Sequence, residues 1–184
     1  MIAQIISLLL DVATGLIGGA CLLRLYMQQQ RVPFGNPLGK LVFALSNWLV
    51  LPLRRIVPAV GSVDSASLLG ALLLELAQFG LLWLLAGAQG SAALVPVLAL
   101  FGLVRLVLSG LTGLIIVYAV LSWVQTRSPL VDLVERLCAP PLRPLRRLIP
   151  MVGGMDLSPL ALLVLLQVLA IILSSAQGEV LRLF

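Results

Sequence analysis

The chain has 184 residues, of which 61% are hydrophobic and 10% are charged, and its mean hydropathy is +1.16. Soluble domains carry about a quarter of their residues as charged ones, so this composition excludes an ordinary soluble domain and predicts a membrane protein. The net charge is +5, yet all but Arg105 and Arg182 of the 12 Lys and Arg residues lie within 24–55 and 127–147. Basic residues confined to alternate loops indicate membrane topology rather than nucleic acid binding.

Histidine is absent, and Cys21 and Cys138 are the only cysteines. This composition excludes His-dependent catalysis and the usual Cys/His metal sites, and no nucleophile–base set or phosphate-binding glycine loop is present. We therefore expect neither an enzyme nor a cofactor or metal. Cys21 lies in an apolar run and Cys138 in a polar one, so we expect no disulfide between them. No basic residue precedes Arg24, so we expect a retained helix rather than a cleavable signal peptide.

Four apolar runs predict four transmembrane helices, because about 20 apolar residues are needed to cross a bilayer. A polar, proline-rich segment separates the first run from the second and the third from the fourth, and a short uncharged turn separates the second from the third. Asp64 or Ser65 is expected to cap the second span. The predicted spans cover, in chain order, residues about 2–26, 66–88, 94–123 and 158–174.

Each polar segment also contains a run with apolar residues at helical spacing, which predicts amphipathic helices over residues about 37–51 and 129–139. Asn36 is expected to be the N-cap of the first, with Pro37 at its first position, where a missing N–H costs nothing. We expect Pro52 to end it. Because both helices adjoin membrane spans, we expect them to lie in the plane of the membrane interface.

The chain repeats itself at an offset of 92 residues, half of its length. Residues 52–64 read PLRRIVPAVGSVD and residues 144–156 read PLRRLIPMVGGMD. We therefore predict two domains, 1–92 and 93–184. Since each contains two spans, the repeats are parallel, unlike the inverted repeats of many transporters. The positive-inside rule then puts both basic loops in the cytoplasm and both termini in the periplasm.

The repeated prolines and glycines predict rigid turns leading back to the membrane, because proline stiffens the backbone and glycine permits positive φ. We interpret them as surface turns; re-entrant, pore-lining loops are the alternative. The residues assigned to this structural motif are Pro52, Pro58, Gly61, Asp64, Pro144, Pro150, Gly153 and Asp156.

Paired arginines accompany the motif in both halves. One hypothesis is that they bind anionic lipid headgroups or an acidic partner protein, since a basic residue near a membrane surface gains about 1 kcal/mol. The alternative is that they only determine topology. The candidate binding residues are Arg54, Arg55, Arg143, Arg146 and Arg147.

Ionisable and amide side chains also occur inside the predicted spans, namely Asp11, Glu75, Arg105 and Gln167. Counted at about 1.5 Å per residue, all four fall near the middle of the bilayer. Such groups often mark an ion or proton path. They can equally form a structural pair, Arg105 with Glu75 or Asp11, and we favour this pairing.

Three features, Arg24-Leu25-Tyr26-Met27-Gln28, Asn36-Pro37-Leu38 and the two PLRRxxPxVGxxD copies, together resemble the YggT family of bacterial membrane proteins. The resemblance covers the whole chain; the family more often has Asn-Pro-Phe at residues 36–38. It implies a small integral protein of the bacterial inner membrane without an agreed biochemical activity. Plastid relatives are associated with maturation of a b-type cytochrome, and some bacterial members with osmotic stress and potassium supply.

Our leading hypothesis is a non-enzymatic membrane scaffold or assembly factor that engages anionic lipids or membrane-protein partners through the twin PLRRxxP elements. The rival hypothesis is an oligomeric ion channel or transporter that uses the polar residues inside the spans. Small residues in the first and third spans would let helices of two copies approach closely, so we also expect homo-oligomers. These residues are Gly15, Gly19, Ser109, Gly110 and Gly113.

Overall fold

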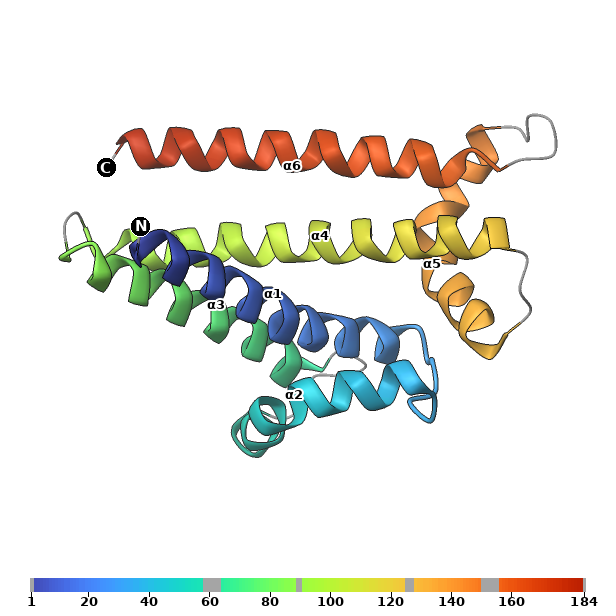
Figure 1. The fold of residues 1–184 in the computed structure, drawn as a ribbon, viewed down its shortest axis with the longest axis horizontal. Helices are drawn as coiled ribbons and strands as arrows, with labels where there is room; N and C mark the ends of the chain where they lie inside the picture. Colours follow the sequence, from blue (N-terminus) through green and yellow to red (C-terminus); the bar gives the residue numbers. More distant parts are fainter. Residues whose placement is uncertain (1, 58–63, 89–90, 125–127, 150–155, 184) are drawn as a thin grey trace.

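The computed structural model describes residues 2–57, 64–88, 91–124, 128–149 and 156–183, and all regular elements within them are helices. Each half of the chain has a long helix, a second helix of 20 residues and another long helix (Figure 1). The helices are α1 (Ile2–Gln29), α2 (Pro37–Ile56), α3 (Ser65–Leu85), α4 (Leu94–Val124), α5 (Pro129–Leu148) and α6 (Ser158–Leu183).

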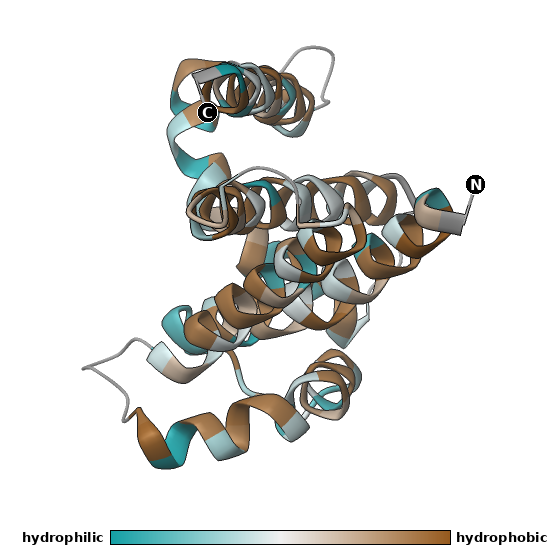
Figure 2. Ribbon diagram, turned by 90° about the vertical axis from the view of Figure 1, so that its left-hand side faces the viewer, coloured by the Kyte–Doolittle hydropathy of each residue, from teal (hydrophilic) through white to brown (hydrophobic). Residues whose placement is uncertain are grey.

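Four of these helices, α1, α3, α4 and α6, are long and apolar enough to cross a membrane. Their outward faces carry many exposed leucine, isoleucine and valine side chains, and Figure 2 shows apolar residues along their length. An all-round apolar helix suits lipid surroundings. The prediction of an all-helical chain with four helices long and apolar enough to cross a membrane is confirmed for the described residues.

Helix α4 lies at the centre and packs against α1, α3, α5 and α6. Both termini lie at the end of the molecule opposite to α5 (Figure 1). The two halves also meet through a hydrophobic cluster in which Met27 and Val42 pack with Leu133 and Leu137. The second half therefore covers the end of α1 where α2 begins.

Helix α2 folds back along the last turns of α1 (Figure 1). Met27 shares a buried cluster with Val42, and Cys21, further back along α1, shares another with Val50. This antiparallel packing differs from the flat orientation that we expected from the apolar stripe of α2. The reason is that the last turns of α1 make both apolar contacts and hydrogen bonds with side chains of α2. Helix α5 instead runs across the end of α4 (Figure 1).

Proline does not end the two amphipathic helices. Helix α2 continues through Pro52 to Ile56, and α5 continues through Pro140, Pro141 and Pro144 to Leu148, so the predicted ends at residues 51 and 139 were too early. An internal proline removes one hydrogen bond and bends a helix, and flanking packing can hold the helix beyond it.

The helix starts follow local sequence signals. Asn36 caps α2 by accepting a hydrogen bond from the Gly39 backbone N–H, as predicted, and Ser128 caps α5 in the same way through Val131. Helix α3 ends at Leu85, earlier than the predicted end at about residue 88, because Gly87 adopts a left-handed φ of 79°.

Helix α6 runs beyond the predicted end at residue 174 to Leu183. Residues 174–179, most of which are polar, continue the helix, and Arg182 pairs with Glu179 one turn back.

Candidate functional site at the start of the second and fourth spans

The first arginine of each repeated pair forms an ion pair with the aspartate that closes the same motif. Arg54 contacts Asp64 through two guanidinium nitrogens, and Arg146 Nε lies 2.8 Å from Asp156 Oδ2. We call these two ion pairs the Arg–Asp clamps. Each clamp joins the end of the amphipathic helix to the start of the following span. The spacing of ten residues between Arg and Asp in both repeats therefore has a structural role.

The second arginine of each pair takes no part in the clamp. Arg55 and Arg147 are exposed, as is Arg143, and none of them takes part in an ion pair between described residues. The five candidate binding arginines thus divide into two that are engaged within the protein and three that face outward. The motif residues Pro58, Gly61, Pro150 and Gly153 lie outside the described residues.

A buried arginine, Arg24 of α1, completes the first clamp. Its side chain is only 4% exposed, and its Nε lies 3.6 Å from Asp64 Oδ2. Its Nη1 donates hydrogen bonds to Asn47 Oδ1 at 2.8 Å and to Ser46 Oγ at 3.2 Å. These hydrogen bonds help to hold α2 against α1. Sequence reasoning gave Arg24 only a role in topology.

Asp64 is fully buried and serves both arginines. Burial by itself would raise the pKa of the Asp64 carboxyl, but hydrogen bonds from Arg54 and Ser67 and the charges of Arg54 and Arg24 outweigh it and lower the pKa below its ordinary value. The carboxylate occupies the N-cap position of α3 but makes no capping hydrogen bond to the backbone. Asp64 therefore stays charged and is committed to the clamp.

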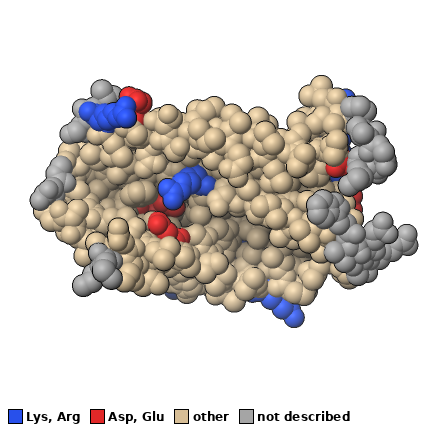
Figure 3. All heavy atoms as spheres, turned by 45° about the horizontal axis from the view of Figure 1, so that its top comes forward, with Lys and Arg blue, Asp and Glu red and all other residues tan. Residues whose placement is uncertain are grey.

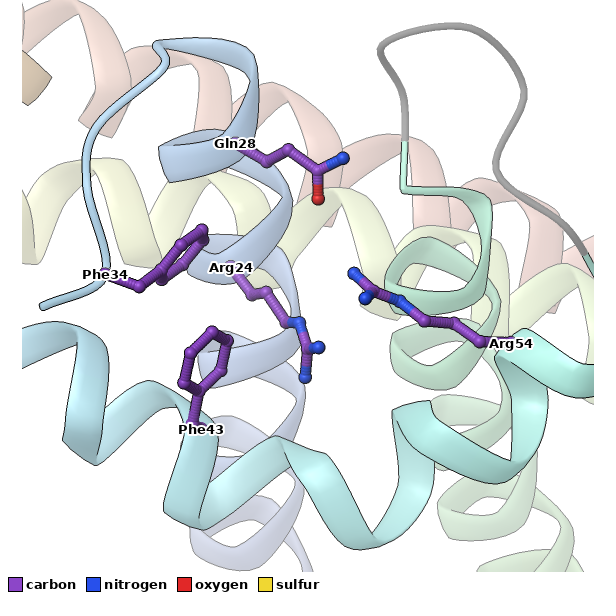
Figure 4. A pocket seen from close by; sticks show the side chains of 5 residues that line it. All are labelled: Arg24, Gln28, Phe34, Phe43 and Arg54. Atoms are coloured by element: carbon purple, nitrogen blue, oxygen red, sulfur yellow. The ribbon is translucent and has the colours of Figure 1, made fainter.

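Above this cluster lies an open cavity of about 400 Å³, lined by Arg24, Gln28, Phe34, Phe43 and Arg54. In Figure 4 the polar ends of Gln28, Arg24 and Arg54 face a shared space. The Phe34 and Phe43 rings stack with centroids 4.7 Å apart, and the Arg24 guanidinium carbon lies 4.8 Å from the Phe43 centroid. We call this the Arg24–Arg54 pocket.

The equivalent place in the second half has different chemistry. Tyr118 Oη accepts a hydrogen bond from Arg146 Nη2 at 2.7 Å, whereas its repeat mate Tyr26 donates to the Leu137 carbonyl oxygen at 2.7 Å. The two clamps differ in the burial of the aspartate: the side-chain exposures are 41% for Arg54 and 1% for Asp64, against 36% for Arg146 and 27% for Asp156. The two repeats thus share the clamp but not its surroundings.

The polar residues inside the spans do not form the ion pair that we favoured. Gln78 Nε2 donates to Asp11 Oδ1 at 2.5 Å, and no carboxylate lies within 4 Å of the Arg105 guanidinium among the described residues. The second half does not share this arrangement, since Gln167 is exposed on α6. Sequence reasoning missed Gln78 as the partner of Asp11.

Glu75, by contrast, is buried against Gly102 and Phe79, within electrostatic range of Arg105 and Asp11. Arg105 itself is exposed on α4. Figure 3 shows basic and acidic side chains near the middle of one face, with the other charged side chains of that view towards its edges.

A family model described as CCB3/YggT matches residues 1–85 and 97–177. The chain belongs to the CCB3/YggT family. Its relatives include YggT of Escherichia coli (strain K12), 37% identical over 170 residues that cover 89% of this chain and 86% of the relative. A protein from the proC 3′ region of Vibrio alginolyticus is 37% identical over 150 residues, covering 79% and 80% of the two chains.

A third CCB3/YggT relative, PA0392 of Pseudomonas aeruginosa, is 34% identical over 143 residues, covering 76% of this chain and 73% of the relative. No solved structure matches the chain. The resemblance inferred from the Arg24–Gln28 segment and the repeated motif is therefore confirmed.

Proposed function

We propose that this protein is a non-enzymatic scaffold or assembly factor of the bacterial inner membrane, and that its exposed arginines bind anionic lipid headgroups or acidic segments of membrane-protein partners. The observation that carries the proposal is that the two arginines of each pair have different contacts. Because Asp64 and Asp156 engage Arg54 and Arg146, the motif presents Arg55 and Arg147 outward with no internal partner among the described residues. A topology signal alone does not need such an arrangement.

The orientation follows from the same charges. The basic residues of α2 and α5 lie in the two segments that connect α1 to α3 and α4 to α6, and the positive-inside rule assigns these connections to the cytoplasm. We accordingly place both termini in the periplasm and treat the halves as parallel repeats. Anionic lipids of the inner leaflet are then within reach of Arg55, Arg143 and Arg147.

Charge reversal tests the proposal. In Arg55→Glu and Arg147→Glu variants, we expect binding of phosphatidylglycerol to weaken at least about fivefold for each site, since each basic residue gains about 1 kcal/mol near an anionic surface. Native mass spectrometry of the detergent-purified protein, titrated with phosphatidylglycerol and with phosphatidylcholine, measures the loss. Arg182→Glu is the matched control, because it makes the same charge change on an exposed side chain of the opposite end. Unchanged phosphatidylglycerol binding in both variants would refute a lipid role, and crosslinking through these residues would then test the partner role.

A second candidate function is ion conduction, and the specific observation favouring it is the group formed by Asp11, Gln78, Glu75 and Arg105. An exposed arginine in the middle of a span is costly in lipid, so a second copy or a water-filled path would have to accommodate Arg105. Potassium and proton flux in proteoliposomes is the test. This candidate requires flux above that of empty vesicles that falls in Glu75→Gln.

A further inference from the structure

The Arg24–Arg54 pocket carries an unbalanced positive charge. Two guanidinium groups line it, and a single carboxylate, Asp64, serves both of them. Ser67 also donates to this carboxylate, so its capacity to neutralise the arginines is shared further. A buried charge that is not fully paired is costly, and an anion in the pocket would complete the pairing.

Hydrogen-bond donors remain available on both arginines. Arg24 Nη1 donates to Ser46 and Asn47 and the buried Nε lies beside Asp64, which leaves Nη2 without a hydrogen bond to any described residue. Arg54 directs Nε and Nη2 to Asp64, which leaves Nη1 with no hydrogen bond to the described part of the chain. Gln28 adds an amide at the rim (Figure 4). Planar guanidinium groups with free donors are suited to phosphate oxygens.

The pocket is held in shape by contacts that do not depend on a ligand. Phe43 stacks on Phe34 and lies beneath the Arg24 guanidinium, and Asn47 fixes the other side of that guanidinium. A volume of about 400 Å³ falls within the range of small-molecule sites. Because the donors are positioned in advance, little ordering is needed on binding.

The repeat makes the pocket specific to the first half. Arg54 is matched by Arg146 at the offset of 92 residues, but the other lining residues are not kept. The mates of Arg24, Gln28, Phe34 and Phe43 are Ile116, Val120, Thr126 and Glu135. The second half thus lacks the buried arginine and places a carboxylate where the first half has an aromatic wall.

We propose that the Arg24–Arg54 pocket is a phosphate-binding site, one per chain, that takes either the phosphate of a lipid headgroup or free phosphate. This proposal rests on the proposed function, because it assigns a ligand to the same membrane-facing region. The pocket, however, uses residues other than Arg55, Arg143 and Arg147. The two ideas can therefore fail separately.

The test uses an isosteric substitution at the rim, because replacing Arg24 would break the packing of α2. Gln28→Glu places a carboxylate beside both arginines and acts as a tethered anion. We expect this variant to unfold at a higher temperature than the wild type without added ligand, and to bind phosphate groups at least tenfold more weakly. Gln30→Glu is the matched control: Gln30 lies nearby, is exposed, does not line the pocket and undergoes the same charge change.

The measurements are the thermal unfolding midpoint and native mass spectra of the full-length protein in neutral detergent, with inorganic phosphate, phosphatidylglycerol or phosphatidylcholine added. Stabilisation by phosphate and by phosphatidylglycerol supports a free-phosphate site that headgroups also enter, and stabilisation by phosphatidylglycerol alone supports a lipid site. In either case Gln28→Glu must abolish the effect and Gln30→Glu must keep it. The proposal is overturned if neither ligand stabilises the wild type, or if Gln28→Glu still responds. An Arg55→Glu/Arg147→Glu variant that keeps the pocket response but loses additional lipids would separate this site from the outward-facing arginines.

Discussion

Arg54 and Arg55 are neighbours in the sequence but have different surroundings. Arg54 holds the buried carboxylate of Asp64, and Arg55 faces outward. Arg146 and Arg147 repeat the arrangement in the second half, although there the aspartate of the clamp is partly exposed. At the residue scale, burial therefore decides how much each clamp stabilises the protein.

We predict that Arg54→Gln destabilises the protein more than Arg146→Gln. Removing Arg54 leaves the buried Asp64 with Arg24 and Ser67 as partners, and an under-paired buried group costs about 1–3 kcal/mol. The Arg146–Asp156 pair is partly solvated, so its loss should cost less than about 1 kcal/mol. Thermal unfolding midpoints of the two variants in one detergent give the comparison, and equal midpoints would contradict this ranking.

The lowered pKa of Asp64 predicts acid sensitivity. A carboxyl whose pKa is lower in the folded state stabilises the fold above its unfolded value of about 3.9, and this contribution is lost as the pH falls through the folded pKa. The wild type should therefore lose stability as the pH falls below about 4. In Asp64→Asn that part of the loss should be absent, while stability near pH 7 is already lower. Unfolding midpoints measured from pH 7 to pH 3 test this, and parallel pH profiles for the two proteins would argue against it.

At the scale of elements, the turn from α1 into α2 shapes the pocket. A Cβ atom at Gly39, in the first turn of α2, would overlap the backbone carbonyl oxygen of Phe34. Phe34 would have to move, and with it one wall of the Arg24–Arg54 pocket. Glycine at residue 39 is therefore required by close backbone approach rather than by its φ angle.

We predict that Gly39→Ala lowers the unfolding midpoint, although alanine favours a helix over glycine by about 1 kcal/mol. Gly178→Ala in α6 is the control, because nothing lies within 4 Å of a Cβ there and only the gain in helix propensity remains. The two substitutions should shift the midpoint in opposite directions. A stabilising Gly39→Ala would mean that Phe34 adjusts freely.

Much of this arrangement was accessible from the sequence, and its failures have physical causes. Apolar length identifies the spans, and the Asn36-Pro37 and Ser128-Pro129 pairs mark where α2 and α5 begin. The end of α2 was misjudged because Pro52 was expected to stop the helix. A proline can instead only bend a helix whose surroundings are well packed, and α2 continues to Ile56. Local signals carry no information on that packing.

The burial of Arg24 was missed, yet a signal existed. Arg24, Ser46 and Asn47 are polar, while their mates at the offset of 92 residues are Ile116, Cys138 and Ala139. Three polar residues that change together between repeats indicate a shared contact in one of them. The partner of Asp11, in contrast, depends on how α1 packs against α3, which no local pattern specifies.

At the scale of the whole molecule, one repeated motif serves both folding and the outer surface. The clamps tie each amphipathic helix to the span that follows it, and the adjoining arginines are exposed. The first half adds a charged pocket whose lining residues, apart from Arg54, differ in type from their mates at the offset of 92 residues. The duplicated sequence has thus kept its structural contact and diverged at its candidate binding site.

The most direct test compares Arg146→Gln with Arg147→Gln, since neither residue lines the Arg24–Arg54 pocket and the two variants remove the same charge from adjacent residues. The measurement is the number of phosphatidylglycerol molecules retained by the purified protein, read by native mass spectrometry. We predict that Arg147→Gln retains fewer with an unchanged unfolding midpoint, whereas Arg146→Gln retains the wild-type number with a slightly lower midpoint. Equal retention by the two variants, or a loss confined to Arg146→Gln, would contradict the assignment of one arginine to the fold and its neighbour to the membrane.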